Sequence, residues 1–179
     1  YLGYNSFNKP TTVKAVNKLG QIRTTTYTYD NNGNQLTCTD PTGKTTSTTY
    51  NTVGLPLTVT DRYGGVTSYT YTEKYQLSTV RNALNNIVST QLYDEDENYV
   101  TATKDALNNT TSYGYDVLGR KLYTEYPDGT REQWTYDEYS RIAVYTDRTG
   151  NSTAYQYDSA GVLIKTINSD GTYSRFAYT

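Results

Sequence analysis

The sequence of 179 residues predicts an all-β fold built from tandem repeats of about 21 residues. Three observations support this prediction. Tyrosine pairs recur at a nearly constant spacing, two turn signals occur in each repeat, and the residues between the turns alternate with a period of two. Because tight turns make consecutive strands neighbours, the chain should form one continuous meander of antiparallel hairpins, with no helix.

The repeats are anchored by the second tyrosine of a Tyr-x-Tyr pair or its equivalent. Successive anchors are 21 or 22 residues apart, except for the first interval of 25 residues. The anchors are Tyr4, Tyr29, Tyr50, Tyr71, Tyr93, Tyr115, Tyr136, Tyr157 and Tyr178. We therefore predict that residues 1–179 form a single array of about eight to nine repeats, with an insertion in the first.

Each repeat has the same internal order. An aromatic residue stands two positions before most anchors, namely at Tyr27, Tyr69, Tyr113, Trp134, Tyr155 and Phe176. A turn residue comes four positions after the anchor, at Gly33, Gly54, Gly119 and Gly161, with Asn8 and Ser140 in equivalent places. Glycine supplies the positive φ that such turns need, and aspartate caps them through its side chain. A second turn in each repeat leaves two short strands, or about 16 in all.

The alternation predicts two different sheet faces. Residues i and i+2 share a face, so each Tyr-x-Tyr pair points the same way, and equivalent tyrosines recur about 9–10 Å apart along the sheet. Aliphatic residues of the intervening strands fill the gaps on this face, at Leu36, Leu57, Leu122, Ile142 and Ile164. Threonine, lysine, asparagine and glutamine form the other face. We expect Cys38, beside Leu36, to be a small buried hydrophobic residue.

Composition excludes several functions. The chain has no histidine, one cysteine, 22 tyrosines and a net charge of -2. Serine-histidine catalysis and a cysteine or histidine zinc site are therefore excluded, and the charge disfavours nucleic-acid binding. No apolar run of about 18 residues is present to span a membrane. We expect a protein without a cofactor and without enzymatic activity.

One acidic stretch has the spacing of a calcium-binding loop. Asp94, Asp96, Asn98 and Asp105 occupy positions that could ligate calcium, but Tyr99 stands where such a loop requires glycine. A widened hairpin turn is the favoured interpretation.

Other residues with chemical potential also have a structural explanation. Two pairs of acids could act as glycosidase carboxylates: Glu125 with Asp128, and Glu132 with Asp137. Acids at repeat spacing are better explained as turn caps. The tyrosine rows could stack against sugars, although a packing or lining role is favoured.

The repeat resembles that of the Rhs/YD-repeat family. The shared pattern is Tyr-x-Tyr-Asp-x-x-Gly, then an aliphatic residue, then Asp-x-x-Gly; residues 115–122 (YDVLGRKL) and 157–163 (YDSAGVL) are close matches. The family includes Rhs polymorphic toxins, the C component of insecticidal toxin complexes, wall-associated proteins and teneurins. The resemblance covers essentially the whole chain. It implies a β-strip that spirals into a hollow shell, which in the toxins holds a C-terminal toxin domain.

One dipeptide resembles a functional site of that family. Asp40-Pro41 is similar to the Asp-Pro junction at which Rhs toxins cut themselves. Here the dipeptide falls in an ordinary repeat turn, where proline suits the second position. We interpret it as a turn.

The resemblance implies a non-enzymatic structural segment of a shell that encapsulates a toxin domain, in a secreted or injected bacterial effector. The alternative is an extracellular adhesion module that binds a protein or glycan.

Sixteen strands about 4.8 Å apart would close into a ring about 25 Å in diameter, too narrow for a domain about 30 Å in diameter. We therefore expect part of a larger shell, with the remaining repeats and a toxin domain as partners. The edge at residues 172–178 carries few charges and predicts edge-to-edge self-association.

Overall fold

The structure is a computed structural model that describes residues 2–178. Its contacts divide the chain into two compact units, Tyr1–Thr90 and Gln91–Thr179. All strand pairings within the units are antiparallel, and the described residues contain no helix, so none is present that could cross a membrane. The predicted all-β hairpin meander is therefore confirmed.

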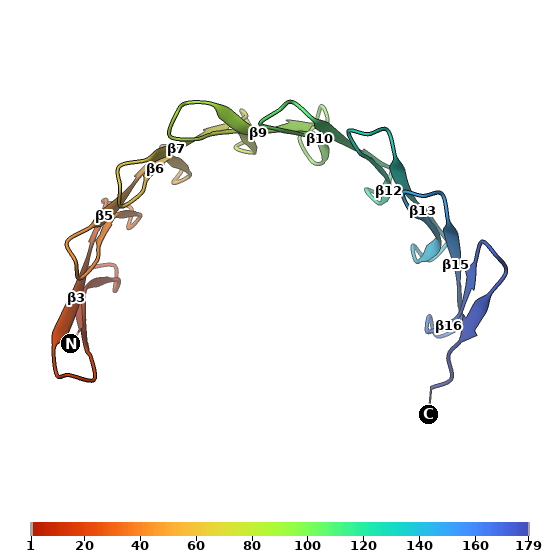
Figure 1. Cartoon of the computed structure of the whole chain (residues 1–179), viewed down its shortest axis with the longest axis horizontal. Coiled ribbons are helices and arrows are strands. Elements are labelled where there is room, and N and C mark those ends of the chain that lie inside the picture. Colours follow the sequence, from red (N-terminus) through yellow and green to blue (C-terminus); the bar gives the residue numbers. More distant parts are fainter. Residues whose placement is uncertain (1, 179) are drawn as a thin grey trace. The chain divides into compact units, whose positions relative to one another are not determined.

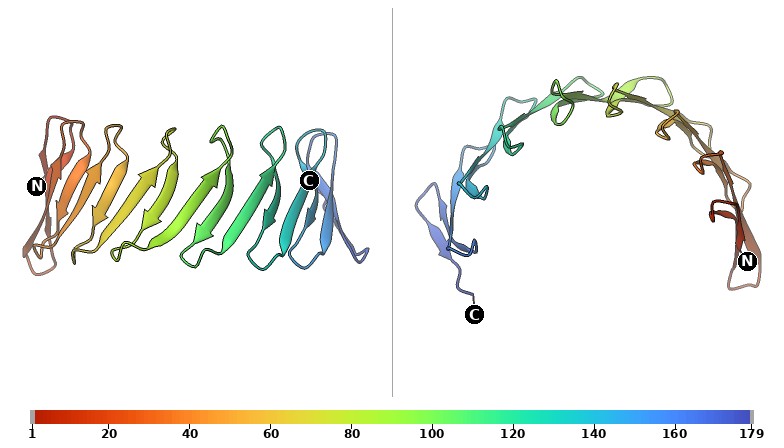
Figure 2. Two further views of the ribbon diagram at one scale, coloured as in Figure 1. Left: turned by 90° about the horizontal axis from the view of Figure 1, so that it is seen from above. Right: turned by 180° about the vertical axis from the view of Figure 1, so that it is seen from behind.

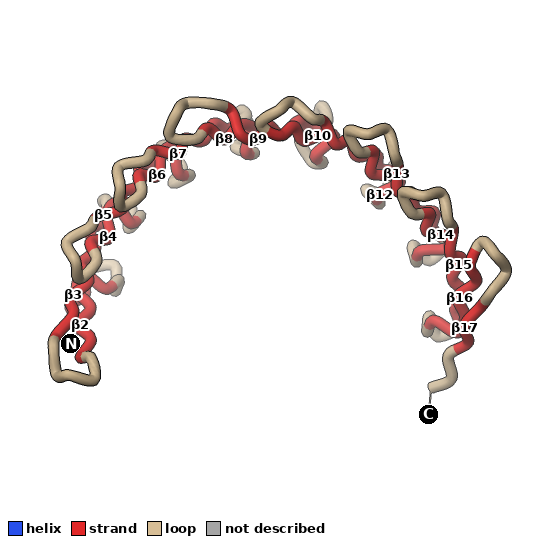
Figure 3. The backbone as a smooth tube through the Cα atoms, viewed as in Figure 1, coloured by secondary structure: helices blue, strands red, loops and turns tan. Residues whose placement is uncertain are grey.

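The first unit contains β1 to β8 and most of β9, and each strand pairs with the next one in the chain (Figures 1 and 3). The strands are β1 (Leu2–Tyr4), β2 (Pro10–Val16), β3 (Ile22–Tyr29), β4 (Gln35–Thr39), β5 (Thr45–Tyr50), β6 (Pro56–Thr60), β7 (Val66–Tyr71), β8 (Leu77–Arg81) and β9 (Ile87–Tyr93).

The second unit begins at the end of β9 and repeats the same arrangement. Its further strands are β10 (Val100–Asp105), β11 (Thr110–Tyr115), β12 (Lys121–Glu125), β13 (Arg131–Tyr136), β14 (Ile142–Thr146), β15 (Ser152–Tyr157), β16 (Leu163–Asn168) and β17 (Tyr173–Arg175). The described residues thus form 17 strands rather than about 16, because the short β1 ahead of the first turn also pairs.

Each unit is a single layer of strands (Figure 2). No second layer covers either face, and among residues 2–178 the buried side chains are Ala102 and Thr124, at 8% and 4% exposure. The expectation of a buried Cys38 is wrong, because its face is open and the residue is only half-buried. Stability must come mainly from the hydrogen-bond ladder and from contacts between neighbouring strands, as in other repeat proteins.

The turns share one backbone geometry. We call the first residue of each turn its head residue. The N–H of the residue three positions later donates to the carbonyl of the head residue. The N–H of the head residue donates to the carbonyl of the residue four positions later, or five positions later in the turn headed by Asp94. The residue three positions after the head residue has a positive φ. The head residues are Asn5, Asn17, Asp30, Asp40, Asn51, Asp61, Thr72, Asn82, Asp94, Asp105, Asp116, Tyr126, Asp137, Asp147, Asp158 and Asn168. This is a type I turn followed by a left-handed residue, a common hairpin loop.

Glycine holds the left-handed position in most of these turns, as predicted. Gly33, Gly54, Gly119 and Gly161 have φ between 77° and 89°. Other residues adopt the same conformation elsewhere, with φ of 65° at Tyr75 and 56° at Glu97. The unit anchored at Tyr71 therefore keeps its turn although Tyr75 replaces glycine.

Two glycines allow a matched test of this turn geometry. Both Gly119 and Gly129 are left-handed, so alanine at either should destabilise the fold by about 1 kcal/mol. Gly129 has open space around it, whereas a Cβ at Gly119 would meet the ring of Tyr99, which stacks on Tyr115. We expect Gly119→Ala to cost about 1 kcal/mol more than Gly129→Ala in urea denaturation. Equal losses would show that the Tyr99 ring moves aside without penalty.

Candidate functional site

The Tyr-x-Tyr residues lie on one face of the sheet in each unit, here called the aromatic face. Strand register places Tyr27 opposite Cys38, Tyr113 opposite Thr124 and Trp134 opposite Tyr145. The aromatic face comprises Tyr27, Tyr29, Tyr50, Tyr69, Tyr71, Tyr113, Tyr115, Trp134, Tyr136, Tyr155 and Tyr157, all half-buried. Ile142 pairs directly with Tyr136 and lies on the same face. Leu36, Leu57, Leu122 and Ile164 are skipped at the register shift beside each anchor, so strand alternation does not place them on this face as expected.

The opposite face carries threonine pairs in the first unit. Thr28 and Thr37 hydroxyls lie 2.6 Å apart across β3 and β4, and Thr49 and Thr58 lie 2.7 Å apart across β5 and β6. The pairs recur at the repeat period. The two faces therefore differ in chemistry, as alternation predicts.

The hydroxyl of an anchor tyrosine bonds to the previous repeat. Tyr50 donates to the carbonyl of Gln35 at 2.8 Å, and Tyr136 donates to that of Lys121 at 2.8 Å. Each acceptor lies six residues after the preceding anchor, next to the bulge that the anchor makes in its pairing. Equivalent bonds join Tyr29 to Pro10, Tyr71 to Pro56 and Tyr157 to Ile142. The anchors therefore link successive repeats.

Desolvation keeps several of these anchors protonated. It raises the pKa of Tyr29, Tyr71 and Tyr115, and the neighbouring tyrosine two residues earlier adds a smaller effect in the same direction. A neutral hydroxyl is the form that donates to a carbonyl. The raised pKa therefore suits the donor role of Tyr29 and Tyr71, whose hydroxyls bond to the carbonyls of Pro10 and Pro56.

Arginine side chains at the end of the turn that follows an anchor make a second link between repeats. Arg120 bonds to Asp116 at 2.7 Å and lies 4.6 Å from the ring centroid of Tyr136 in the next repeat. Arg141 repeats this arrangement with Asp137 and Tyr157, at 2.7 and 4.6 Å. This link is not among the sequence predictions, although the spacing Asp-x-x-x-Arg recurs one repeat apart and could have indicated it.

The acids proposed as glycosidase pairs all have local partners. Glu125 forms an ion pair with Arg131, and Asp128 accepts hydrogen bonds from Thr130 and Arg148. Asp137 heads a turn: desolvation raises its pKa, but bonds from Arg141 outweigh this and hold the pKa below its usual range. Turn and cross-strand bonding therefore accounts for these carboxylates.

Glu132 is the centre of a small polar cluster on the aromatic face. It accepts hydroxyl bonds from Tyr126 at 2.7 Å and Tyr145 at 2.8 Å, and these bonds lower its pKa. Trp134 packs against Tyr145, with ring centroids 5.5 Å apart. Glu132 is one of the acids singled out from the sequence, but its tyrosine partners could not be predicted, because one comes from the turn before β13 and the other from β14.

The cluster predicts an unusual tyrosine titration. The hydrogen bond to Glu132, followed by desolvation, raises the pKa of Tyr145 to about 12 from a usual value of 10.0. The stabilising bond is therefore complete below pH 10.0 and is lost as the pH rises through about 12. The Cζ resonance of Tyr145 should report this titration, and Glu132→Gln should return the midpoint toward 10.0. An unchanged midpoint in the variant would contradict the assignment.

The proposed calcium residues do not converge. Asp94, Asp96 and Asn98 lie in the turn before β10, whereas Asp105 heads the turn after it. These turns are separated by the length of β10, about 20 Å for a six-residue strand. Within residues 2–178, no group of three or more acid, cysteine or histidine side chains could hold a metal ion.

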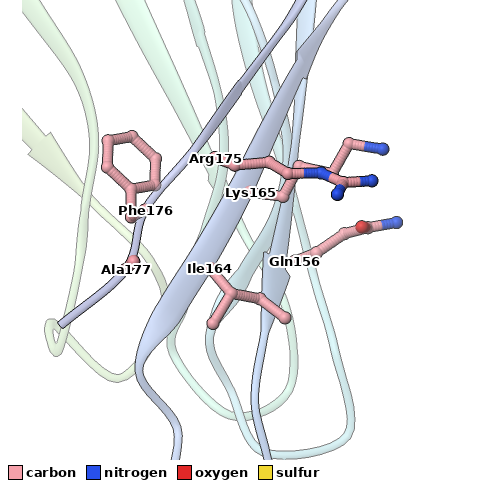
Figure 4. Close-up of a pocket in the computed structure, with 6 residues that line it drawn as sticks. All are labelled: Gln156, Ile164, Lys165, Arg175, Phe176 and Ala177. Atoms are coloured by element: carbon pink, nitrogen blue, oxygen red, sulfur yellow. The ribbon is translucent and has the colours of Figure 1, made fainter.

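A shallow pocket of about 440 Å³ lies beside β17. Its lining residues are Gln156, Ile164, Lys165, Arg175, Phe176 and Ala177. Lys165 pairs directly with Arg175 across β16 and β17, and Figure 4 shows their charged ends pointing the same way as Gln156, with Phe176 on the other side. The pocket has no carboxylate and offers no group for acid–base chemistry at neutral pH.

The fold and its linked repeats define a single-layer β-strip anchored by tyrosines. Two crystal structures are similar to it, that of TcdB2-TccC3-TEV and that of TcdB2-TccC3 without its hypervariable C-terminal region. The match to the first covers 96% of this chain at a TM-score of 0.58 and 15% identity. The match to the second covers 97% at a TM-score of 0.60 and 14% identity.

These neighbours are Rhs/YD-repeat toxin complex components, so the resemblance predicted from the repeat is confirmed at the level of the fold. The chain spans 12% of the length of either neighbour. No protein-family model matches the chain, and no curated protein does either.

Proposed function

We propose that this chain is a non-enzymatic structural segment of an Rhs-type β-shell that encloses a toxin domain of a secreted or injected bacterial effector. The observation that carries the proposal is the anchor link: tyrosine hydroxyls such as those of Tyr50 and Tyr136 tie one repeat to the next. Repeats joined only to their neighbours make an extended wall rather than a compact core. The fold similarity to TcdB2-TccC3 supports the same assignment.

The side-chain chemistry supports a non-enzymatic role. Turn aspartates use their carboxylates to hold backbone N–H groups, as Asp147 does with Thr149 and Asn151. Several lysine and arginine side chains lie over aromatic rings, for example Arg148 at 4.0 Å from the Tyr126 ring centroid. These groups stabilise the wall.

Protease protection in the intact protein tests encapsulation. A domain enclosed by the shell should survive limited proteolysis at least about tenfold longer than the same domain expressed alone. Gln133→Pro should abolish this protection, because Gln133 pairs with both neighbours of β13 and proline removes a ladder donor. Equal survival of the enclosed and free domains would refute encapsulation.

A proline that suits its turn is the matched control. Ala83 follows the turn head Asn82, a position that Pro41 and Pro127 occupy in two other turns. Ala83→Pro should therefore fold normally and preserve the protection. Loss of protection in both variants would mean that proline acts through general unfolding.

We also propose that the β17 edge pairs with another strand. β17 covers only Tyr173–Arg175, so the edge is shorter than residues 172–178, and its described neighbour is β16 alone. Light scattering should show oligomers of this chain that grow with concentration, and Ser174→Lys should suppress them. Ser169→Lys, in the preceding turn, is the control. A chain that stays monomeric at hundreds of micromolar would contradict edge pairing.

A further inference from the structure

Two tyrosines of neighbouring repeats stack on each other in the second unit. The ring centroids of Tyr99 and Tyr115 lie 4.9 Å apart, and the ring planes are inclined by 28°. Tyr99 closes the turn headed by Asp94, directly before β10, and Tyr115 is the anchor at the end of β11. Two phenol rings therefore connect one repeat to the next.

This stack stands where other repeats have the anchor hydroxyl bond. Tyr136, for example, donates to the carbonyl of Lys121, which lies six positions after the preceding anchor. The equivalent residue for Tyr115 is Tyr99, but the turn here is one residue longer, and the Tyr99 carbonyl accepts the N–H of Asp94. Within residues 2–178, Tyr115 makes no hydroxyl bond to the preceding repeat, so ring stacking is the contact that the longer turn leaves.

The Tyr99 ring is both positioned and accessible. The residue is 39% exposed, so a soluble oxidant can reach its phenol. Its hydroxyl end lies over Gly119, where a Cβ would overlap the ring. Tyr115 is half-buried and already in contact with the Tyr99 ring. A radical formed on Tyr99 therefore has a second phenol beside it.

We propose that Tyr99 and Tyr115 are a site of oxidative cross-linking, at which a peroxidase acting with hydrogen peroxide joins the two rings as dityrosine. Each phenol loses one electron and one proton, and the two phenoxyl radicals combine through a ring carbon next to each hydroxyl. The hydrogen atoms on those carbons then move to the oxygens, which restores both phenols. The two hydrogen atoms lost overall reduce one hydrogen peroxide to two waters.

The product is a covalent link between two repeats. The chain has a single cysteine, so it has no internal disulfide. A carbon–carbon bond between residues 99 and 115 restricts the unfolded chain in the way a disulfide does, and it therefore stabilises the fold. The inference does not depend on the proposed shell, because both tyrosines lie within the second unit.

Oxidation of the whole chain tests the proposal. The purified protein, at low micromolar concentration, is treated with a haem peroxidase and limiting hydrogen peroxide, and the monomer is isolated. Peptide mass spectrometry of the monomer should find residues 99 and 115 linked at least about tenfold more often than any other pair of tyrosines, because positioned groups react at a high effective concentration. Absence of this linked peptide, or links formed only between chains, would overturn the proposal.

Phenylalanine variants identify the two rings. Tyr99→Phe and Tyr115→Phe keep a ring at each position but remove the phenol that forms the radical, so each should abolish the cross-link within the chain. Tyr113→Phe is the matched control, because it removes a half-buried tyrosine of the same strand, whose hydroxyl lies 3.2 Å from Thr103 Oγ1. It should leave the yield unchanged. A cross-link that persists in Tyr99→Phe would place the reaction elsewhere and refute the assignment.

Two glycine variants test the ring position while every tyrosine is kept. Gly119 and Gly129 are both left-handed, but a Cβ would meet the Tyr99 ring at Gly119 and open space at Gly129. Gly119→Ala should therefore lower the yield of the cross-link by about tenfold or more, whereas Gly129→Ala should not change it. Circular dichroism before oxidation checks that both variants are folded. Equal yields in the two variants would show that the stack does not position the rings for coupling, and would overturn the proposal.

Discussion

Replacing Tyr136 by alanine is expected to lower the free energy of unfolding by about 2–4 kcal/mol, the lower part of the range for large aromatic deletions, because the ring is half-buried. The variant loses three interactions at once. These are ring packing on the aromatic face, the hydroxyl bond to Lys121 at 2.8 Å and the Arg120 contact at 4.6 Å. Urea denaturation followed by circular dichroism measures the loss.

Two further variants divide this effect. Tyr136→Phe keeps the ring and removes only the hydroxyl, so it should cost about 1 kcal/mol, the net value of a typical hydrogen bond. Tyr63→Ala removes a ring that is 82% exposed and should cost less than about 0.5 kcal/mol. If Tyr63→Ala were as costly as Tyr136→Ala, the assignment of the aromatic face would be wrong.

The repeat period determined most of the fold in advance. Strand alternation and the glycine positions predict where strands end, because a left-handed turn residue fixes the hairpin locally. Tyr75 and Ser140 adopt the same left-handed conformation, with φ of 65° and 64°, so the turn is kept where another residue replaces glycine. The strand boundaries and the turn conformation can both be predicted from the sequence of a single repeat.

Contacts between repeats could not be predicted in this way. The acceptor of the Tyr136 hydroxyl is the carbonyl of Lys121, and a backbone carbonyl has no sequence signal. The same holds for Arg141, whose partners in the next repeat are the Tyr157 ring and the backbone carbonyl of Asp158. Such links became visible only when neighbouring repeats were placed side by side.

On the face opposite the aromatic face, one repeat has a glycine–tyrosine pair where others have a threonine pair. Gly114 pairs with Tyr123 at the place where other repeats pair Thr28 with Thr37 and Thr49 with Thr58. A Cβ on Gly114 would overlap the Tyr123 ring, and the backbone at Gly114 is not left-handed. The glycine is therefore required by the ring above it rather than by its own φ.

Gly114→Thr alone should destabilise the chain by about 1–3 kcal/mol, because the new side chain displaces the Tyr123 ring. That ring also lies 4.3 Å from the guanidinium carbon of Arg131, so its displacement breaks a second contact. Adding Tyr123→Thr should recover much of the loss, since the double variant recreates the threonine pair of other repeats. A double-mutant cycle in urea should give a coupling of about 1 kcal/mol or more in favour of the double variant. Additive losses would show that Gly114 serves the strand rather than the ring.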